Sequence, residues 1–306
     1  MSAAFGRHSR RWFLQAAALS AAGLACGCKL FDKPASLFQQ VNKLPPLSAP
    51  PDSMRFDVVF VERPVGDSLM GRELWQSVDE LVLQQEKGKS DLLRRNGFRA
   101  GVAGSNPPPA LQTLLGLKSD FAYEPSAEKS KHLAGQQITL RTEGETEIQV
   151  SPLVQEGTVE ISDGRQAIAR SYEQCCGMFR VVAHRLQDGW AQLEFIPVVR
   201  HGAESLHHVA GADGWQFANG QKSESFYNQR FQLTLGIGEM AVISADDLAA
   251  NSMGHLFFMG RSHLNAAPGA SEQKGDVHRL LVVRLSDMPL NENPYSGRPR
   301  QARTGD

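Results

Sequence analysis

The strongest constraint on the fold of this chain is a two-residue hydrophobic period that begins near residue 136 and continues to residue 286. Apolar and polar residues alternate along it in short runs, as at Ile138 and Leu140. Successive side chains of a β-strand point to opposite faces of a sheet, so the alternation predicts strands with one buried face. Further strands are expected over 215–217, 231–235, 240–244, 256–259 and 277–285. Many short strands separated by turn residues predict a mainly antiparallel β-sandwich or barrel-like domain over residues 135–288.

A β-hairpin is expected over residues 177–200 of this region. Asp188-Gly189 is a strong two-residue turn signal, and alternating apolar residues flank it on both sides. Gly236 and Gly238, between two later strands, are expected to form another turn. They do not predict a phosphate-binding loop, because a third glycine and a following helix are missing.

Residues 55–120 follow a different pattern, which predicts a small α/β module. The β-branched and aromatic run over 56–61 is typical of a strand, and a second strand is expected over 98–102. Short helices are expected after Asp91 and over 109–115, where Pro109 suits the first turn of a helix.

A further helix is predicted from Gly71, because apolar residues recur there at helical spacing: Leu74, Trp75, Val78, Leu81 and Val82. Trp75 belongs to this regular stripe, so we expect it in the core rather than stacked on a ligand. An α/β module followed by a β-rich domain places the chain in the α+β class.

The first 27 residues predict an export signal. They contain three arginines and no acidic residue, followed by a weakly apolar stretch over 12–25 and small residues, which is the layout of a secretory signal peptide. The run Ser9-Arg10-Arg11-Trp12-Phe13-Leu14 resembles the twin-arginine export motif, with Gln15 where lysine is common. This resemblance implies export of an already folded protein, in some cases one that carries a cofactor.

Residues 24–28, Leu-Ala-Cys-Gly-Cys, resemble the cleavage box of bacterial lipoproteins. The resemblance implies that a cysteine after a small residue is acylated and becomes the mature N-terminus. Cys28 is the expected lipidation site and Cys26 is the alternative; plain signal-peptidase cleavage that leaves free thiols is a further alternative. An acyl group would anchor the exported chain to a membrane.

The segment over 28–54 predicts a tether, since five prolines favour extended and poorly packed backbone: Pro34, Pro45, Pro46, Pro50 and Pro51. The tail over 289–306 is rich in Pro, Gly, Arg and Asn and is expected to be mobile. No apolar run in the sequence reaches the roughly 18–20 residues of a membrane-spanning helix.

Charge argues against a nucleic-acid partner. The chain has 32 Lys+Arg against 33 Asp+Glu, and removal of residues 1–27 leaves 29 against the same 33. A mildly acidic mature chain has no broad basic field with which to bind a polyanion.

The candidate metal ligands are His201, His207 and His208, with Glu204 between them. Adjacent histidines point to opposite faces of an extended segment, and the spacing matches no helical metal motif, so a polar loop is the favoured interpretation. Asp246-Asp247 could form a carboxylate pair for acid–base work or calcium, but a solvated turn is favoured.

Cys175 and Cys176 are adjacent, a spacing unsuited to a disulfide between them and unlike a redox Cys-X-X-Cys site. Two buried thiols in a strand are therefore expected. With no catalytic constellation, the sequence predicts neither an enzyme nor a cofactor.

Part of the β-rich region resembles the C-terminal β-domain of bacterial secretins, over residues 178–286. The runs 231–235 and 241–243, joined through Gly238-Glu239, are similar to a strand–turn–strand unit of that domain. Gly254, Leu256 and Phe257 match its Leu-Gly-X-Leu-Phe segment. The runs 193–199 and 280–285 are similar to two of its other strands.

The sequence also departs from the secretin pattern. Met253 replaces a leucine, and Asp246-Asp247 stands where paired glycines are usual. Taken whole, the chain resembles exported bacterial lipoproteins that carry a secretin-like β-region, a resemblance that supplies no catalytic residues.

These observations predict an exported, lipid-anchored cell-envelope protein with a non-enzymatic binding or assembly role. It would be exported across the inner membrane and then anchored to a membrane, either on the periplasmic side or at the outer membrane. Its expected partners are the membrane, through the acyl anchor, and envelope proteins or further copies of itself. One alternative is a secretin-like component of a secretion or pilus-type complex. Another is an envelope hydrolase or carbohydrate-processing enzyme that uses Asp246, Asp247 or the His201–His208 loop.

Overall fold

The computed structural model describes residue 50 and the ranges 52–80, 88–117, 133–211, 214–246, 251–262 and 276–289, without the side chains of 207–219. All of these residues belong to one unit, Ala49–Asp306. The predicted signal peptide, Cys26, Cys28 and nearly all of the predicted tether and tail lie outside the described residues.

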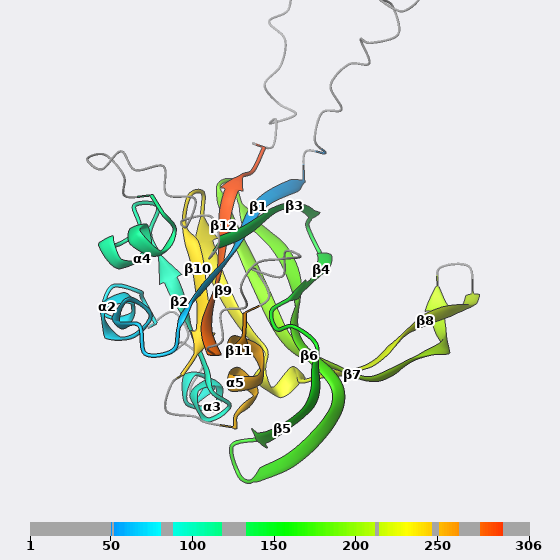
Figure 1. Cartoon of the computed structure of the whole chain (residues 1–306). Coiled ribbons are helices and arrows are strands. Elements are labelled where there is room, and N and C mark those ends of the chain that lie inside the picture. Colours follow the sequence, from blue (N-terminus) through cyan, green and yellow to red (C-terminus); the bar gives the residue numbers. More distant parts are fainter. Residues whose placement is uncertain are drawn as a thin grey trace, which may run out of the picture. The chain divides into compact units, whose positions relative to one another are not determined.

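The first of two antiparallel sheets combines strands from both halves of the chain (Figure 1). Its order is β2-β10-β12-β1-β3, and β11 pairs with β12. The strands are β1 (Ser53–Pro64), β2 (Phe98–Ala103), β3 (Leu133–Arg141), β10 (Met240–Ala245), β11 (Met259–Arg261) and β12 (Asp276–Asp287).

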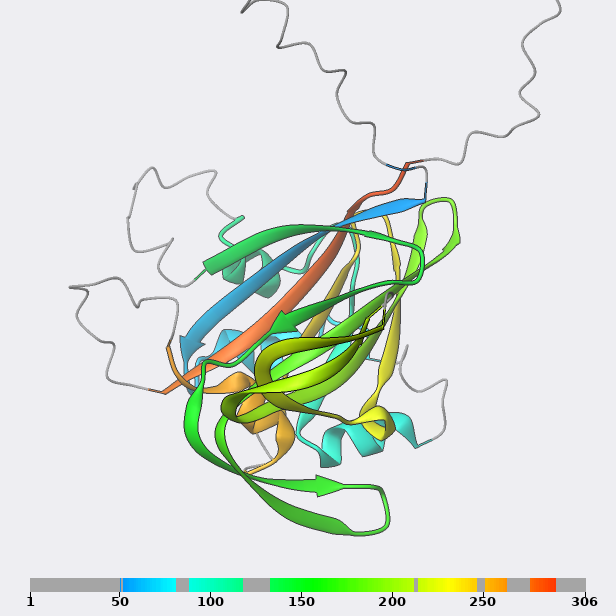
Figure 2. The same ribbon diagram turned by 90° about the vertical axis from the view of Figure 1, so that its right-hand side faces the viewer.

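The second sheet is formed by consecutive strands and is strongly curled (Figure 2). Its order is β4-β6-β7-β8, with β5 also paired to β6 and β9 to β7. The strands are β4 (Gly144–Gln149), β5 (Val154–Ser162), β6 (Ala167–Gln187), β7 (Trp190–Gly211), β8 (Gly214–Ser225) and β9 (Phe231–Gly236). The α+β class with a β-rich, mainly antiparallel body is confirmed.

The expected boundary between an α/β module over 55–120 and a β-rich domain over 135–288 is not a boundary between folded units. β1 pairs with β12 on one side and β3 on the other, and β2 pairs with β10. The segment over 55–120 therefore supplies two strands to a sheet completed by the later part of the chain. Periodicity shows where a strand lies but not which distant strand it pairs with.

The helices are short. They are η1 (Ser68–Met70), α2 (Arg72–Trp75), α3 (Lys89–Arg95), α4 (Pro109–Leu114), η4 (Tyr227–Gln229) and α5 (Met253–Phe258). The helix predicted from Gly71 ends after one turn, because Asp79 leaves it to bridge Val102 of β2. Leu81 and Val82 lie outside the described residues. Among the residues that the structure describes, no helix is long and apolar enough to cross a membrane.

The strand expected over 256–259 is wrong, because Met253–Phe258 form helix α5. The Ser252 hydroxyl caps it by accepting a hydrogen bond from the His255 N–H at 3.2 Å. A run of Leu, Phe, Phe and Met is compatible with either a buried strand or a buried helix by period alone. The Ser252 cap and the close approach of Gly254 to Gly97, in the loop after α3, favour the helix.

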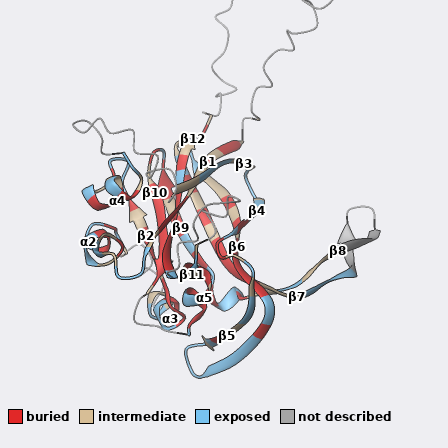
Figure 3. Cartoon of the chain, viewed as in Figure 1, coloured by how far each residue is buried: buried red, intermediate tan, exposed pale blue. Residues whose placement is uncertain are grey.

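Two apolar clusters explain why β10 and β12 are buried along nearly their whole length (Figure 3). The larger lies between the sheets and contains an aromatic network: Phe98, Phe179, Phe195, Phe231, Phe257 and Phe258. The smaller includes Trp75 and Leu74 of α2, packed with residues of β1, β10 and β12. Trp75 is 5% exposed, so its expected place in the core is confirmed.

Candidate functional site

The expected hairpin over 177–200 is confirmed, but its strands are longer than predicted. β6 has 21 residues and β7 has 22, joined by the two-residue turn Asp188-Gly189. β7 pairs with β6 only as far as Arg200, opposite Cys176. Beyond that point it pairs with β8 alone, and the hairpin formed by 201–211 and 214–222 projects from the sheets (Figure 1). We call this hairpin the arm.

The arm leaves the body at a hydrogen-bonded root. The pairing register shifts between His201 and Ser205, next to Gly202 in left-handed backbone at φ +80°. The Gln221 side-chain amide donates to the carbonyl of Gly202 at 2.7 Å and to that of Gln174 at 2.8 Å. These contacts set the direction in which the arm departs from β6.

Tyr172 of β6 and His201, the first residue of the arm, lie against each other with ring centroids 5.0 Å apart. The Tyr172 hydroxyl donates to Glu224 at 2.9 Å, and Arg170 pairs with the same carboxylate. Burial raises the pKa of Tyr172, whereas burial and the nearby Lys222 lower the pKa of His201. His201 is therefore a packed, mainly neutral side chain at neutral pH.

The candidate metal ligands do not form a cluster within the part of the chain that the structure describes. No group of three or more His, Cys, Asp or Glu side chains is placed there to hold an ion. Glu204 is exposed at the start of the arm. Asp247 and the side chains of His207 and His208 lie outside the described residues. The backbone N–H of Asp246 donates to the Gly97 carbonyl at 2.8 Å.

Cys175 and Cys176 are confirmed as buried free thiols of β6. Cys175 faces the core between the sheets, and Cys176 packs with Met178 and Val198 on the opposite face. Burial raises the pKa of both thiols, which lowers the fraction of reactive thiolate at neutral pH.

The expected turn at Gly238 is also confirmed. Gly238 has φ +88°, and the Glu239 N–H donates to the Gly236 carbonyl at 3.0 Å. The Glu239 carboxylate accepts the Gly236 N–H at 2.8 Å. A carboxylate at this position would repel a phosphate.

A buried Ser–His pair went unnoticed in the sequence, because its members come from different strands. The Ser244 hydroxyl lies 2.7 Å from Nε2 of His278 and donates to the Arg279 carbonyl at 2.8 Å. Because the single hydroxyl proton of Ser244 is donated to the Arg279 carbonyl, the Ser244 oxygen accepts its other hydrogen bond from Nε2–H of His278. A donor cannot serve as the base that activates a serine, and this pair has a structural role.

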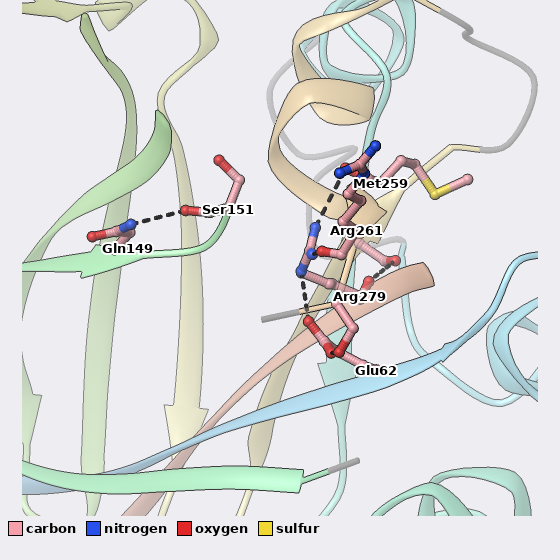
Figure 4. Close-up of polar contacts among 8 residues, drawn as sticks. Glu62, Gln149, Ser151, Met259, Arg261 and Arg279 are labelled. Carbon is pink, nitrogen blue, oxygen red and sulfur yellow. Dashed lines mark hydrogen bonds and ion pairs between the residues drawn. The ribbon is translucent and has the colours of Figure 1, made fainter. Parts of the chain in front are cut away.

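A buried ion pair between Glu62 of β1 and Arg279 of β12 was likewise not predicted (Figure 4). Their side chains are 1% and 0% exposed, and Nε of Arg279 donates to Glu62 at 2.9 Å. Arg279 also donates to the carbonyls of Met259 and Arg261, and Ser262 donates to Glu62. Burial lowers the pKa of Arg279, and the Glu62 charge opposes that effect. The hydrogen bonds from Arg279 to the β11 carbonyls add to the pairing of β11 with β12.

Two surface pockets contain no convergent catalytic set among the described residues. One of about 410 Å³ is lined by Trp75 and Arg99, whose guanidinium lies 4.5 Å from the Trp75 ring centroid and is paired with Glu80. The other, of about 310 Å³, lies between the β5–β6 hairpin and η4 and is lined by Ile168, Tyr227 and other residues. Asp246 also lines the first pocket, but none of the candidate histidines lines either pocket.

Comparison with known proteins gives a weak structural resemblance to secretins. No family model and no curated protein matches the chain. The chain is similar to the V. cholerae type IV competence pilus secretin PilQ, at 9% identity and a TM-score of 0.20, over 78% of this chain and 61% of that one. It is also similar to a chain of the ETEC pilotin–secretin AspS–GspD complex, at 11% identity and a TM-score of 0.20, over 90% and 59% respectively. The chain thus spans about 60% of the length of these secretin chains.

Proposed function

We propose that this chain is an exported, lipid-anchored envelope protein that works by binding or assembly through its arm. The observation that carries the proposal is that strands β7 and β8 continue well beyond the sheet that they share with β6. None of the described side chains over 202–206 and 220–222 belongs to a buried apolar cluster. The arm therefore gains little stability from the core of its own chain.

The physical argument concerns burial. A two-stranded hairpin outside a core is marginally stable in water, and its strand edges can pair with another chain. Leu206, which is 66% exposed, lies on the arm next to Ser205 and Glu204. A protein partner, either another envelope protein or a further copy, supplies the burial that the arm lacks.

The export and anchoring part of the proposal is supported by the sequence. The twin-arginine-like run from Ser9 to Leu14 precedes the lipobox-like cysteines Cys26 and Cys28, and a proline-rich segment leads from there to β1. An anchor followed by a tether holds a folded unit near a membrane while its arm engages a partner.

A secretin-like component of a secretion or pilus-type complex is a more specific form of this role. The similarity of residues 178–286 to the secretin β-domain, through Gly238, Gly254, Leu256 and Phe257, favours it. In that case the assembly is a large, detergent-stable ring.

Shortening the arm tests the proposal. Replacement of residues 203–220 by Asn-Gly joins Gly202 to Gln221, which are already hydrogen bonded, through a favourable hairpin turn. We expect full-length protein from mild detergent extracts to be a multi-subunit assembly by native mass spectrometry, and the shortened variant to be a single chain. Its thermal unfolding should be nearly unchanged, because the described arm residues contribute no core.

Two point variants complement the shortened arm, one as a further test and one as its control. Leu206→Asp should weaken the assembly, whereas Val65→Asp, at a site that is also about half exposed but away from the arm, should not. A wild-type protein that is a single chain without partner would overturn the assembly role. A mass of many copies would favour the secretin-like form.

Lipidation is tested separately by growth with radiolabelled palmitate. We expect label on the wild-type protein and its loss in Cys28→Ser. Label retained in Cys28→Ser but lost in Cys26→Ser would move the site to Cys26, and an unlabelled wild-type protein would exclude the acyl anchor. Metal analysis of the same sample tests the hydrolase alternative.

A further inference from the structure

Two turns at one end of the sheets carry exposed apolar side chains. Trp190 follows the β6–β7 turn and is 41% exposed, and Ile237 in the β9–β10 turn is 46% exposed. The turns are adjacent, since the Ile237 N–H donates to the Gly189 carbonyl at 2.9 Å. Leu186, on the other side of the β6–β7 turn, is 53% exposed. We call these three residues the apolar tip.

The apolar tip lies at the end where β1 begins. The Gly238 N–H, next to Ile237, donates to the Leu285 carbonyl of β12 at 2.7 Å. Two residues further along β12, Asp287 is opposite Arg55, and the Ser286 hydroxyl donates to the Arg55 carbonyl at 3.1 Å. Figures 1 and 2 both place the β6–β7 turn near the start of β1 and the end of β12. The N-terminal segment therefore joins the folded unit beside the tip.

The position of the tip matters because that segment leads back to the proposed anchor. The roughly 25 residues from Cys28 to Ser53 span at most about 90 Å when fully extended. A tether of this length keeps the end of the unit that carries the tip at a high effective concentration near the bilayer. A small contact is then sufficient, because the tether has already restricted the movement of the unit.

We propose that the apolar tip rests in the headgroup region of the membrane that anchors the chain. Tryptophan has an apolar ring and a polar N–H, which suits the membrane–water interface, and Ile237 and Leu186 add exposed aliphatic surface at the same two turns. Three side chains are too few for a specific dimer, which requires on the order of 800 Å² from each copy. The proposal rests on the proposed lipid anchor.

The arginines near the tip are paired with carboxylates, and the Glu239 carboxylate in the β9–β10 turn accepts the Gly236 N–H, so apolar insertion rather than attraction to anionic lipid drives the contact. Arg185 donates to Asp188 at 2.7 Å and to the Pro289 carbonyl at 2.6 Å. Arg55 lies 3.6 Å from Asp287. The contact should therefore form on zwitterionic vesicles and change little with salt.

Quenching by brominated lipid tests the contact in the full-length, membrane-extracted protein reconstituted into phosphatidylcholine vesicles. Trp190→Phe removes the reporter and leaves every other tryptophan in place, so the difference from wild type is the emission of Trp190. We expect dibrominated phosphatidylcholine to remove about half of that emission, since interfacial side chains lie roughly 5–10 Å into the headgroup–acyl boundary. The quenching should be the same at low and high salt.

Tyr227→Trp in the Trp190→Phe background places a tryptophan at a site that is also about half exposed but lies in η4, and this reporter should not be quenched. Ile237→Ser should reduce the quenching of Trp190 severalfold while the unfolding temperature stays close to wild type. If Trp190 of the reconstituted protein is not quenched, or is quenched no more than the Tyr227→Trp reporter, the proposal is overturned.

The palmitate label on the same sample separates this proposal from the proposed anchor. A labelled protein whose Trp190 is not quenched leaves the anchor standing and overturns the tip contact. An unlabelled protein whose Trp190 is quenched excludes the acyl anchor and retains the contact. Protection of Trp190 from acrylamide in lipid-free detergent, together with no lipid quenching, would assign the tip to a second copy and overturn the proposal.

Discussion

Replacing Arg279 by methionine should lower the free energy of unfolding by about 3–5 kcal/mol. The substitution keeps an unbranched side chain in the core but leaves the Glu62 carboxylate buried and without its cation. It also removes the donors that hold the Met259 and Arg261 carbonyls of β11. Urea denaturation followed by circular dichroism measures the change, with a lower midpoint and an unchanged slope as the expected result.

A double variant separates the charge effect from the packing effect. Glu62→Leu together with Arg279→Met removes both charges, and replacing a whole buried pair by apolar residues is often close to neutral. We expect the double variant to recover much of the loss, though not all, because the β11 carbonyls still lack donors. A single variant within about 1 kcal/mol of wild type would contradict the structural role of the pair.

Gly254→Ala should cost about 3 kcal/mol or more, because overpacking here meets backbone rather than a movable side chain. A Cβ atom at residue 254 would lie 1.8 Å from the carbonyl oxygen of Gly97. Either α5 or the loop after α3 must move, and α5 carries Phe257, whose ring centroid lies 5.2 Å from those of Phe98 and Phe179. The aromatic network between the sheets would then repack.

Differential scanning calorimetry measures this effect, which we expect as a fall of roughly 6–12 °C in the unfolding temperature. Gly104→Ala is the matched control, since an added Cβ there meets no atom within 4 Å. The control should change stability by no more than about 0.5 kcal/mol. Equal effects at the two positions would refute the close contact at Gly254.

The same glycine illustrates what a local pattern can and cannot predict. The period of the run over 256–259 suggested a strand, whereas Met253–Phe258 form α5. Periodicity distinguishes buried from exposed residues well, but a short and wholly apolar run has no polar face from which to read the period.

The buried polar groups were missed for a different reason. Glu62 and Arg279 are 217 residues apart in the chain, and Ser244 and His278 are 34 residues apart. Each pair forms only because the two strands that carry it are neighbours in one sheet. The same pairing of β1 with β12 removes the expected boundary between an α/β module and a β-rich domain.

Features that depend on neighbouring residues could be predicted from the amino-acid sequence: the alternation that produces the strands, the turns at Asp188-Gly189 and Gly238, and the burial of Cys175 and Cys176. The fold was needed to show how far β7 and β8 extend beyond the sheet that they share with β6, where the arm departs, and that the apolar tip lies beside the start of β1. Hydrophobic patterning specifies which face of a strand is buried. Which strands become neighbours depends on the packing of the whole core, and that packing joins segments far apart in the chain.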